Sequence, residues 1–320
     1  MSARAAVQRY ALVGAWIAVI VVFSLLKPDT FATTANVQNI LGSQAVLLVV
    51  TLGLLLPLTT GDFDLSVASV LTLSGMVLAL LNGEHGWPLL PAIAAALACG
   101  LAIGALNGAC VVLLGLDSFI VTLGSGTFVM GIVAWISGSR TVTGISPELS
   151  DWVINNRIFG VSMIFYYGLV LAVVLWYGLT YTALGRRLLI VGRGRSVAKL
   201  SGLRVGALRW GALVAAGFVA ALAGVLYAGT TGGADPSSGN SFLLPAFAAA
   251  YLGATAVSPG RFNAWGTFIA VYFLVTGITG LQLLGVDSFV QQLFYGGALV
   301  LAVALSQIVR RRAAGREVAA

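Results

Sequence analysis

Long apolar runs alternate with short polar segments along the whole chain. Ten of these runs carry no charged residue and reach at least the length of about 17 residues that a transmembrane helix needs. They cover residues 10–26, 30–61, 65–83, 85–116, 118–139, 158–185, 210–234, 236–260, 262–286 and 288–309. The pattern predicts an all-α integral membrane protein with about ten transmembrane helices in a single domain over residues 1–320.

The composition agrees with a membrane location. Of the 320 residues, 59% are hydrophobic and only 8% are charged, whereas charged residues make up about 25% of an average soluble protein. Lipid must therefore be the solvent for most of the chain. These figures exclude a disordered, coiled-coil, collagen-like or disulfide-stapled protein, because each of those classes needs a different composition or repeat.

Basic residues are segregated across the predicted topology. With ten spans and the N-terminus inside, all but three of the 17 Lys and Arg fall on one face, the exceptions being Lys27, Arg140 and Arg157. Loops rich in Lys and Arg stay in the cytoplasm, so we expect both termini to be cytoplasmic. Two connections are long: an outer loop at 139–161, with room for a short surface helix, and an inner loop at 183–209. The net charge of +7 is then a signal of topology, and we expect no nucleic-acid partner.

Motifs for nucleotide binding, hydrolysis and metal binding are missing from the sequence. A phosphate-binding loop requires Gly, four residues and then Gly-Lys-Ser/Thr, but Lys199 is preceded by Ala198 and followed by Leu200. The only histidine, His85, lies in a predicted outer turn, and no Cys/His pair has the spacing of metal ligands. We therefore expect no enzyme activity, cofactor or metal site in this chain, and ATP hydrolysis would require a separate subunit.

A polar segment at 60–69 lies between the second and third apolar runs and carries two carboxylates and three hydroxyl groups close together. The helix after Pro57 is expected to break there, and Asp64 or Ser66 can cap the next helix by accepting hydrogen bonds from its first N–H groups. Ionisable groups near membrane depth are, however, often functional. The sequence leaves a capping role and a role in the substrate path both open.

This segment also carries a resemblance. Gly61-Asp-Phe-Asp-Leu-Ser-Val-Ala-Ser69 resembles the GGxDLSVGS element of the membrane permease subunits of ribose-type ABC sugar importers. Further elements that are similar to those of the family follow in its order: Gly104-Ala-Leu-Asn-Gly108, Ser118-Phe-Ile-Val-Thr-Leu-Gly124, Thr182-Ala-Leu-Gly-Arg-Arg187, Gly192 with Ala198-Lys-Leu-Ser-Gly-Leu203, Leu252-Gly253, Ser258-Pro-Gly-Arg261, Gly266-Thr267 and Leu283-Leu-Gly-Val286. Three positions depart from the family pattern: Asp62 replaces a Gly, Ser118 replaces a Pro, and Gly192-Arg-Gly-Arg195 replaces a Gly-Gly-Asn turn.

The resemblance implies a permease subunit of an ATP-driven importer for a monosaccharide or related polyol, working by alternating access in the bacterial cytoplasmic (inner) membrane. It implies three partners besides membrane lipid: a cytoplasmic ATPase subunit, an extracytoplasmic sugar-binding protein, and a second permease copy or a similar permease that completes a dimer. On this basis the candidate residues of the substrate path are Asp64, Ser66, Asn107, Phe119 and Thr122.

The inner loop is the candidate contact with the ATPase. Across 195–204, apolar residues recur every three positions, as in a short amphipathic helix that could dock in a partner's groove. The candidate coupling residues are Gly185, Arg186, Arg187, Gly192, Val197, Leu200, Gly202 and Leu203. On the residues alone, a loop that only enforces orientation and contacts anionic lipid fits equally well; the resemblance favours coupling.

An ion-coupled secondary transporter of a small polar solute is the alternative function. Such a protein needs acidic groups within the membrane and an inverted repeat with broken helices in both halves. Asp62 and Asp64 satisfy the first requirement, but the sequence suggests no matching acidic break in the second half. We therefore prefer the importer.

Overall fold

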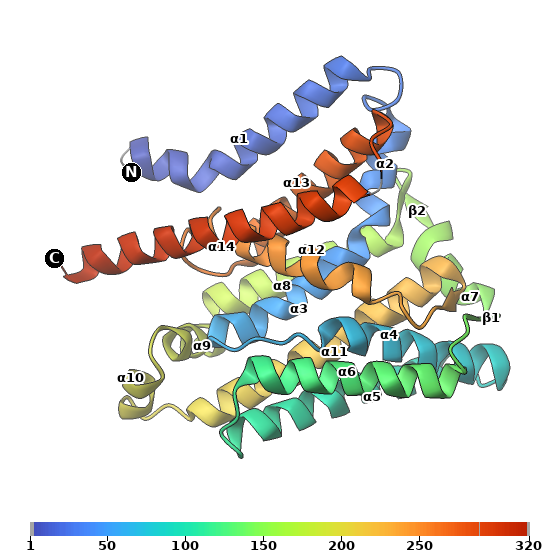
Figure 1. Cartoon of the computed structure of the whole chain (residues 1–320), viewed down its shortest axis with the longest axis horizontal. Helices are drawn as coiled ribbons and strands as arrows, with labels where there is room; N and C mark the ends of the chain where they lie inside the picture. Colours follow the sequence, from blue (N-terminus) through green and yellow to red (C-terminus); the bar gives the residue numbers. More distant parts are fainter. Residues whose placement is uncertain (1–2, 288, 319–320) are drawn as a thin grey trace.

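The computed structural model describes the backbone of residues 3–287 and 289–318 and the side chains of residues 9–287 and 289–307. The fold is almost entirely helical (Figure 1). Its helices are α1 (Ala3–Leu26), α2 (Thr34–Ser43), α3 (Ala45–Thr60), α4 (Val67–Leu78), η1 (Ala79–Glu84), α5 (Leu89–Val112), α6 (Ser118–Ser137), α7 (Pro147–Ser150), η2 (Asp151–Asn155), α8 (Met163–Tyr181), α9 (Ala183–Arg193), α10 (Arg195–Leu200), α11 (Val205–Thr231), α12 (Asn240–Gly253), α13 (Ala264–Leu283) and α14 (Phe289–Val318).

Four two-residue strands pair near one end of the molecule. Strand β1 (Val142–Thr143) pairs antiparallel with β4 (Gly233–Ala234), and β2 (Arg157–Ile158) pairs with β3 (Val161–Ser162). We call this end the β1–β4 face. The other end, which carries α9 and α10, is the α9–α10 face; the N-terminal end of α1 and the C-terminal end of α14 lie there too (Figure 1).

The predicted all-α membrane architecture is confirmed, but the predicted number of spans needs a correction. Within the described residues, eight helices are long and apolar enough to cross a membrane, or nine if α2 and α3, bent by 41° at their junction, form one span. The run at 236–260 instead begins with a turn at 236–239 and continues as α12, which has only 14 residues and is thus about 21 Å long, short of the hydrocarbon thickness. Pro236 and the small polar residues after it favour this turn.

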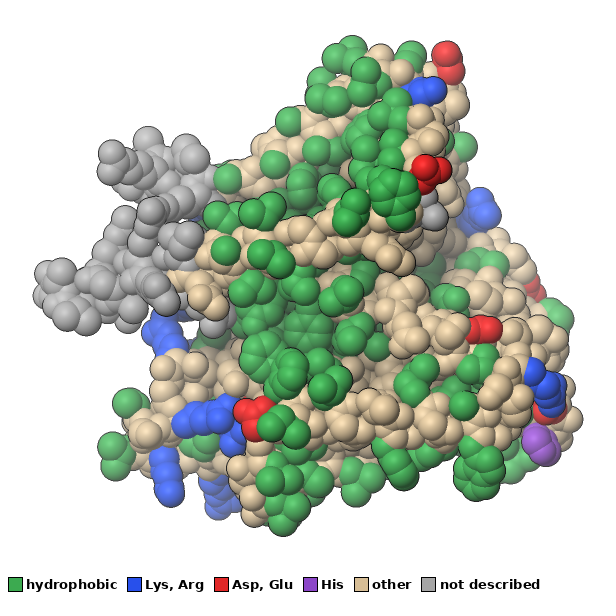
Figure 2. Space-filling model, in the orientation of Figure 1, with side chains coloured by type: hydrophobic (Ala, Val, Ile, Leu, Met, Phe, Trp, Pro, Cys, Tyr) green, Lys and Arg blue, Asp and Glu red, His purple; other side chains and the backbone are tan. Residues whose placement is uncertain are grey.

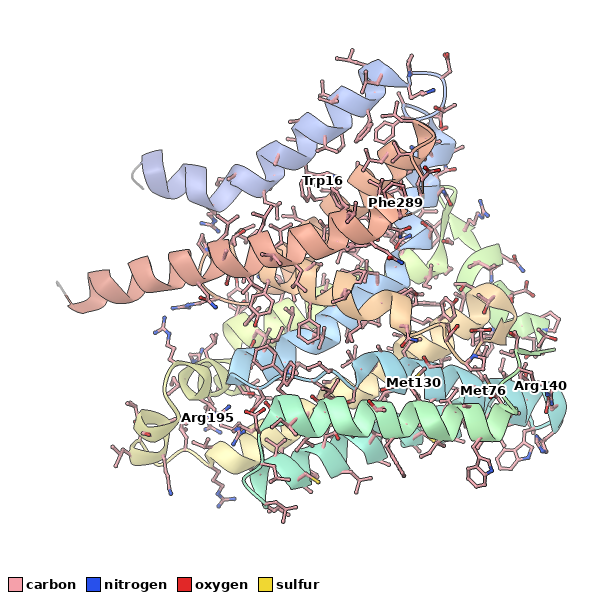
Figure 3. All side chains as sticks on the ribbon, viewed as in Figure 1. Trp16, Met76, Met130, Arg140, Arg195 and Phe289 are labelled. Carbon is pink, nitrogen blue, oxygen red and sulfur yellow. The ribbon has the colours of Figure 1, made fainter. Side chains whose placement is uncertain are left out.

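Most basic side chains gather at one end of the molecule, as the sequence pattern suggests. Figure 2 shows the largest group of Lys and Arg side chains beside α9 and α10, and Figure 3 places Arg195 at that end and Arg140 at the other. The loop at 139–161 contains α7 and η2, where room for a short surface helix was predicted. The loop at 183–209 contains α10, which covers part of the helix predicted across 195–204, and also α9, which was not predicted.

Helices α3 and α11 form the centre of the bundle. Every residue of α3 is buried, and α11 packs against α3, α4 and α5. Gly100, Gly104 and Gly108 lie where α5 meets α11: a Cβ atom at Gly104 would come within 2.6 Å of the Leu213 carbonyl oxygen, and one at Gly108 would meet the Trp210 ring. These glycines permit the close helix contact that their four-residue spacing predicts.

The two halves of the chain repeat one arrangement. Helix α4 packs against α5, α6 and α11, while α12 packs against α13, α14 and α3. Each of α4 and α12 begins after an extended segment, but the first segment starts at the α9–α10 face and the second at the β1–β4 face (Figure 1). The two broken helices meet where the Gly239 N–H donates to the Thr72 hydroxyl at 3.0 Å. Segments 45–137 and 205–307 therefore form an inverted repeat.

The sequence carries the same repeat. Residues 59–66 read TTGDFDLS and residues 230–237 read TTGGADPS; residues 113–119 read LLGLDSF and 283–289 read LLGVDSF. The expectation that the second half has no matching acidic break is wrong, since Asp235 stands where the first half has Asp64. The match was hidden because the second break lies where two predicted apolar runs, 210–234 and 236–260, adjoin. Asp235 is the only charged residue that separates these runs.

Candidate transport and coupling site

The segment 61–66 joins the buried end of α3 to the buried start of α4. Gly61 adopts φ 79°, a left-handed conformation that glycine reaches without strain, and ends α3. The N–H groups of Gly61 and Asp62 then donate to the carbonyl oxygens of Leu58 and Pro57. The chain continues in extended form to α4, and this places Asp62 and Asp64, both only 1% exposed, inside the protein.

Four of the five candidate path residues meet in one polar cluster. The Asp64 Oδ1 atom accepts from the Ser66 hydroxyl at 2.6 Å and from the Ser66 N–H at 3.0 Å. The Asn107 amide donates to the Ser66 hydroxyl at 2.9 Å, and the Leu65 N–H donates to the Thr122 hydroxyl at 3.0 Å. Helices α4, α5 and α6 thus supply one side chain each around the turn that Asp64 forms.

The two carboxylate oxygens of Asp64 differ in their surroundings. Oδ1 serves the local turn by accepting from Ser66, whereas Ser66, the N-cap residue of α4, makes no capping hydrogen bond through its side chain. Oδ2 is buried and has no hydrogen-bond partner among the described residues. A buried acceptor without a donor costs about 1–3 kcal/mol, so Oδ2 is a place where a hydroxyl donor would bind favourably.

Phe119 lies outside this polar cluster. Its side chain is 46% exposed and packs edge-on against Phe63, which stacks on Phe247 of α12. The Phe63 N–H donates to the Ser118 hydroxyl at 3.0 Å. Ser118, which replaces the Pro of the family pattern, thus accepts a hydrogen bond from the segment 61–66. Phe119 therefore belongs to an aromatic row beside the cluster.

Asp62 holds an ion-pair network that the sequence interpretation missed. The Arg209 guanidinium of α11 donates to both Asp62 oxygens, at 2.7 and 2.8 Å. The Arg195 guanidinium of α10 donates to Asp62 Oδ1 at 2.8 Å and to the Gly61 carbonyl oxygen at 3.0 Å. We call Asp62, Arg195 and Arg209 the Asp62 network. A signal existed in the sequence, because an acidic residue at 62 and the basic turn at 192–195 are paired departures from the family pattern.

The coupling candidates lie together at the α9–α10 face. Gly185 packs closely on the backbone of Gly178 and Leu179, and Gly192 packs on the Thr59 carbonyl oxygen, so a side chain at either would collide. Gly202 adopts φ 77° and turns the chain after α10.

The side chains of the coupling loop face outward from this chain. Helix α10 ends at Leu200, within the predicted amphipathic stretch. Val197 is 65% exposed and Leu200 is 89% exposed, while Leu203 is half-buried and Arg186 and Arg187 are exposed. The apolar positions thus form a surface open to a partner.

A bundle of membrane-length helices, built as an inverted repeat with a break in each half, is an architecture of membrane transport proteins. The model of the family described as "Branched-chain amino acid transport system / permease component" matches residues 36–303, and the chain belongs to this family. The relatives include the D-allose transport system permease protein AlsC of Escherichia coli K12, 31% identical over 92% of this chain and 90% of that protein, and the ribose import permease protein RbsC of the same strain, 33% identical over 90% of each. The xylose transport system permease protein XylH of Escherichia coli K12 is 26% identical over 95% of this chain and 93% of that protein. No solved structure matches the chain.

These comparisons confirm the predicted class. The chain is a multi-pass transport permease of the ribose-type importer class, and none of the comparisons favours the ion-coupled alternative. Its inverted repeat of broken helices is therefore compatible with a permease of this class, and such a repeat does not by itself indicate coupling to an ion.

Proposed function

We propose that the chain forms one transmembrane subunit of an ATP-driven importer in the bacterial inner membrane and carries a monosaccharide or related polyol. Similarity to permeases named for D-allose, ribose and xylose supports the substrate class. A second permease completes the transmembrane part, a sugar-binding protein delivers the substrate from outside, and an ATPase subunit binds below. The α9–α10 face is cytoplasmic in this proposal, because it carries the basic loop.

The observation that carries the coupling proposal is the contact between α10 and the break at 61–66. Arg195 bonds Asp62 and the Gly61 carbonyl oxygen, and Gly192 rests on Thr59. A push on α9 and α10 by an ATPase subunit would reach the break through these contacts. Since Asp64 is two residues from Asp62 in the same extended segment, the movement would change the surroundings of the Asp64 cluster.

Asp64 and Ser66 are proposed to contact substrate hydroxyl groups, with Asn107 and Thr122 positioning the turn that holds them. The unpartnered Oδ2 atom of Asp64 supports this role, since an ionised carboxylate accepts strong hydrogen bonds from hydroxyls. Phe119 and Phe63 supply an adjoining apolar surface of the kind that covers sugar C–H groups.

Leu200→Asp tests the docking role of α10. Leu200 is 89% exposed, so the substitution should leave folding and insertion intact while it places a charge in the apolar contact with the ATPase. We expect the ATPase subunit to be lost on co-purification and sugar uptake to fall at least about tenfold. Leu200→Met keeps an apolar side chain and is the matched control. Normal ATPase retention and uptake in the Asp variant would refute the docking role.

The orientation has its own test. Ser196 is exposed on α10, and Ser196→Cys should react with a membrane-impermeant thiol reagent only after cells are opened. Labelling from outside intact cells would place α10 on the outer side and reverse the proposed topology.

A further inference from the structure

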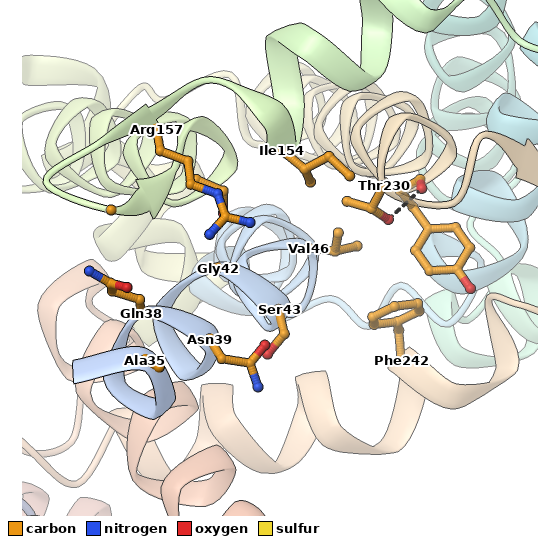
Figure 4. Close-up of a pocket in the computed structure, with 13 residues that line it drawn as sticks. Ala35, Gln38, Asn39, Gly42, Ser43, Val46, Ile154, Arg157, Thr230 and Phe242 are labelled. Atoms are coloured by element: carbon orange, nitrogen blue, oxygen red, sulfur yellow. Dashed lines mark hydrogen bonds between the residues drawn. The ribbon is translucent and has the colours of Figure 1, made fainter. Parts of the chain in front are cut away.

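A cleft of about 450 Å³ opens on the β1–β4 face, between α2 and the β2–β3 hairpin (Figure 4). This volume lies within the range of small-molecule sites. Helix α2 and the hairpin contribute most of the wall, and Thr230 and Tyr227 of α11 and Phe242 of α12 close the far side. The cleft therefore borders the second break, at 230–237.

The lining combines the groups that recognise a sugar. Gln38 and Asn39 supply amides, Ser43 and Thr230 supply hydroxyls, and Arg157 directs its guanidinium into the cleft (Figure 4). Tyr227 and Phe242 form an aromatic pair with ring centroids 5.5 Å apart. Amide and hydroxyl groups both donate and accept, as sugar hydroxyls do, and aromatic rings pack against sugar C–H groups.

Two of these polar groups are engaged within the chain, since the Gln38 amide donates to the Phe159 carbonyl oxygen at 3.2 Å and the Thr230 hydroxyl donates to the Tyr227 carbonyl oxygen at 2.6 Å. The others are free to bind a ligand. The side chains of Asn39, Ser43, Arg157 and Tyr227 make no hydrogen bond or ion pair with any other residue in the described part of the chain. Arg140 on the same face differs, since it pairs with Glu84 at 2.7 Å. Among the described residues that line the cleft, none is an Asp or Glu that could neutralise Arg157.

The inverted repeat supplies a second reason. At the first break, the corresponding positions Leu56, Thr59 and Leu71 are buried, and the Asp62 network ties that segment to α10 and α11. At the second break, Tyr227, Thr230 and Phe242 face an open cleft. The molecule is thus closed at the α9–α10 end of the repeat and open at the β1–β4 end.

From these observations we infer that the cleft is the outer sugar subsite of the permease, which receives one monosaccharide before the path opens toward the Asp64 cluster. Arg157 and Asn39 donate to its hydroxyl oxygens, Ser43 exchanges a hydrogen bond with it, and the Tyr227–Phe242 pair covers one apolar face. This inference rests on the proposed function for its substrate class.

Direct binding to the purified permease tests the subsite without the ATPase or the binding protein. The probes are radiolabelled D-ribose, D-allose and D-xylose in equilibrium binding. We expect at least one probe to saturate the wild-type permease, and Arg157→Gln and Asn39→Ala each to weaken its binding at least about fivefold, as expected when a hydrogen bond to ligand is lost. Arg140→Gln and Asn156→Ala, on the same face but outside the cleft lining, are the matched controls and should stay within about twofold of wild type.

Two results would overturn the inference. One is wild-type affinity in both cleft variants, or no saturable binding of any probe to the wild-type permease. The other is an anionic lipid, seen by native mass spectrometry, that wild type retains, that Arg157→Gln loses and that no sugar displaces, since this would make the cleft a lipid headgroup site. Uptake by vesicles containing the full importer separates the two proposals. Sugar uptake at wild-type rates by both cleft variants refutes the subsite alone, whereas ATP hydrolysis without any sugar uptake by wild type refutes the proposed function.

Discussion

The break at 59–66 and its counterpart at 230–237 share their sequence pattern and their turn, yet their carboxylates lie in opposite surroundings. In each, the Asp Oδ1 atom accepts from the N–H and hydroxyl of the serine two residues later. The Oδ2 atom of Asp235 also accepts from the Thr141 hydroxyl at 2.7 Å, while the Oδ2 atom of Asp64 is buried without a partner. The same turn is thus enclosed by protein at the first break and lies in an open loop at the second.

The position two residues before each carboxylate explains part of the difference. Asp62 in the first break attracts Arg195 and Arg209 and draws α10 and α11 over the segment. Gly233 in the second break instead pairs with Thr143 in a short strand, where a Cβ atom would meet the Val142 carbonyl oxygen at 2.5 Å. The ionic contact closes the first break, whereas at the second break β1 covers Gly233 and Ala234 and leaves Asp235 partly exposed.

Of the variants that test the difference between the two breaks, the one that removes the Asp62 carboxylate should have the largest effect on stability and transport. Asp62→Ala leaves two guanidinium groups without their partner, of which Arg209 is mostly buried. Breaking a buried pair costs about 3–5 kcal/mol, and the half-exposed Arg195 places this case near the lower end. We expect a lower thermal midpoint of the purified permease and ATP hydrolysis that no longer drives uptake in vesicles.

Glu84→Ala is the control for Asp62→Ala, because it breaks the exposed Arg140–Glu84 pair at the opposite face. Exposed pairs contribute about 0–1 kcal/mol, so this variant should behave almost as wild type. Equal losses in the two variants would show that the Asp62 network has no special role in coupling.

Substitution of the two repeated carboxylates should have a smaller and more selective effect. Asn can still accept the hydrogen bonds of the turn through one oxygen, so Asp64→Asn should keep near-normal membrane abundance but transport poorly, while Asp64→Ala should lose both. The same change at the half-exposed Asp235 should leave uptake within about twofold of wild type. Uptake assays normalised to membrane protein measure this difference.

The contrary result for Asp64 is easy to distinguish. Full uptake by the Asn variant, with only the Ala variant impaired in proportion to lost protein, would assign Asp64 to the turn alone. Ser66→Ala and Thr122→Val should give milder losses than Asp64→Asn, because each removes the hydrogen bonds of one hydroxyl group but leaves the Asp64 carboxylate in place.

The sequence predicted the residues of the Asp64 cluster because they lie in local sequence motifs that can be recognised without a structure. Asp64, Ser66, Asn107 and Thr122 each lie in a motif of the family, and the structure brings those motifs together. The apolar runs likewise predicted most helices, since about 20 residues without charge have few alternatives to a membrane span. Phe119 shows the limit of this approach, since membership in a motif did not place it in the polar cluster.

Other features required the folded chain. The pairing of Asp62 with Arg195 and Arg209 joins residues far apart in sequence, and any of several basic residues in the inner loop could have been the partner. The second break was readable as a repeat of TTGxxDxS, but the apolar run that contains α12 concealed it. The cleft beside it is formed by α2, the β2–β3 hairpin and α11, which no local pattern relates to one another.

The smallest expected effect is the pH dependence that Asp235, in the second break, gives to the stability of the protein. Hydrogen bonds donated by the Ser237 hydroxyl, the Thr141 hydroxyl and the Ser237 N–H hold the pKa of Asp235 below its ordinary value of 3.8. A carboxyl whose pKa is lower in the folded protein stabilises the fold above the unfolded value, and this stabilisation is lost as the pH falls through the folded value. Wild type should therefore have a slightly higher thermal midpoint than Asp235→Asn at pH 6, and the difference should shrink as the pH falls below about 3.8 and disappear once the pH is below the pKa of Asp235 in the folded protein. Because Asp235 is mostly accessible to water, the difference stays small. A gap between the two midpoints that persists or widens in acid would show that Asp235 does not act through its ionised form.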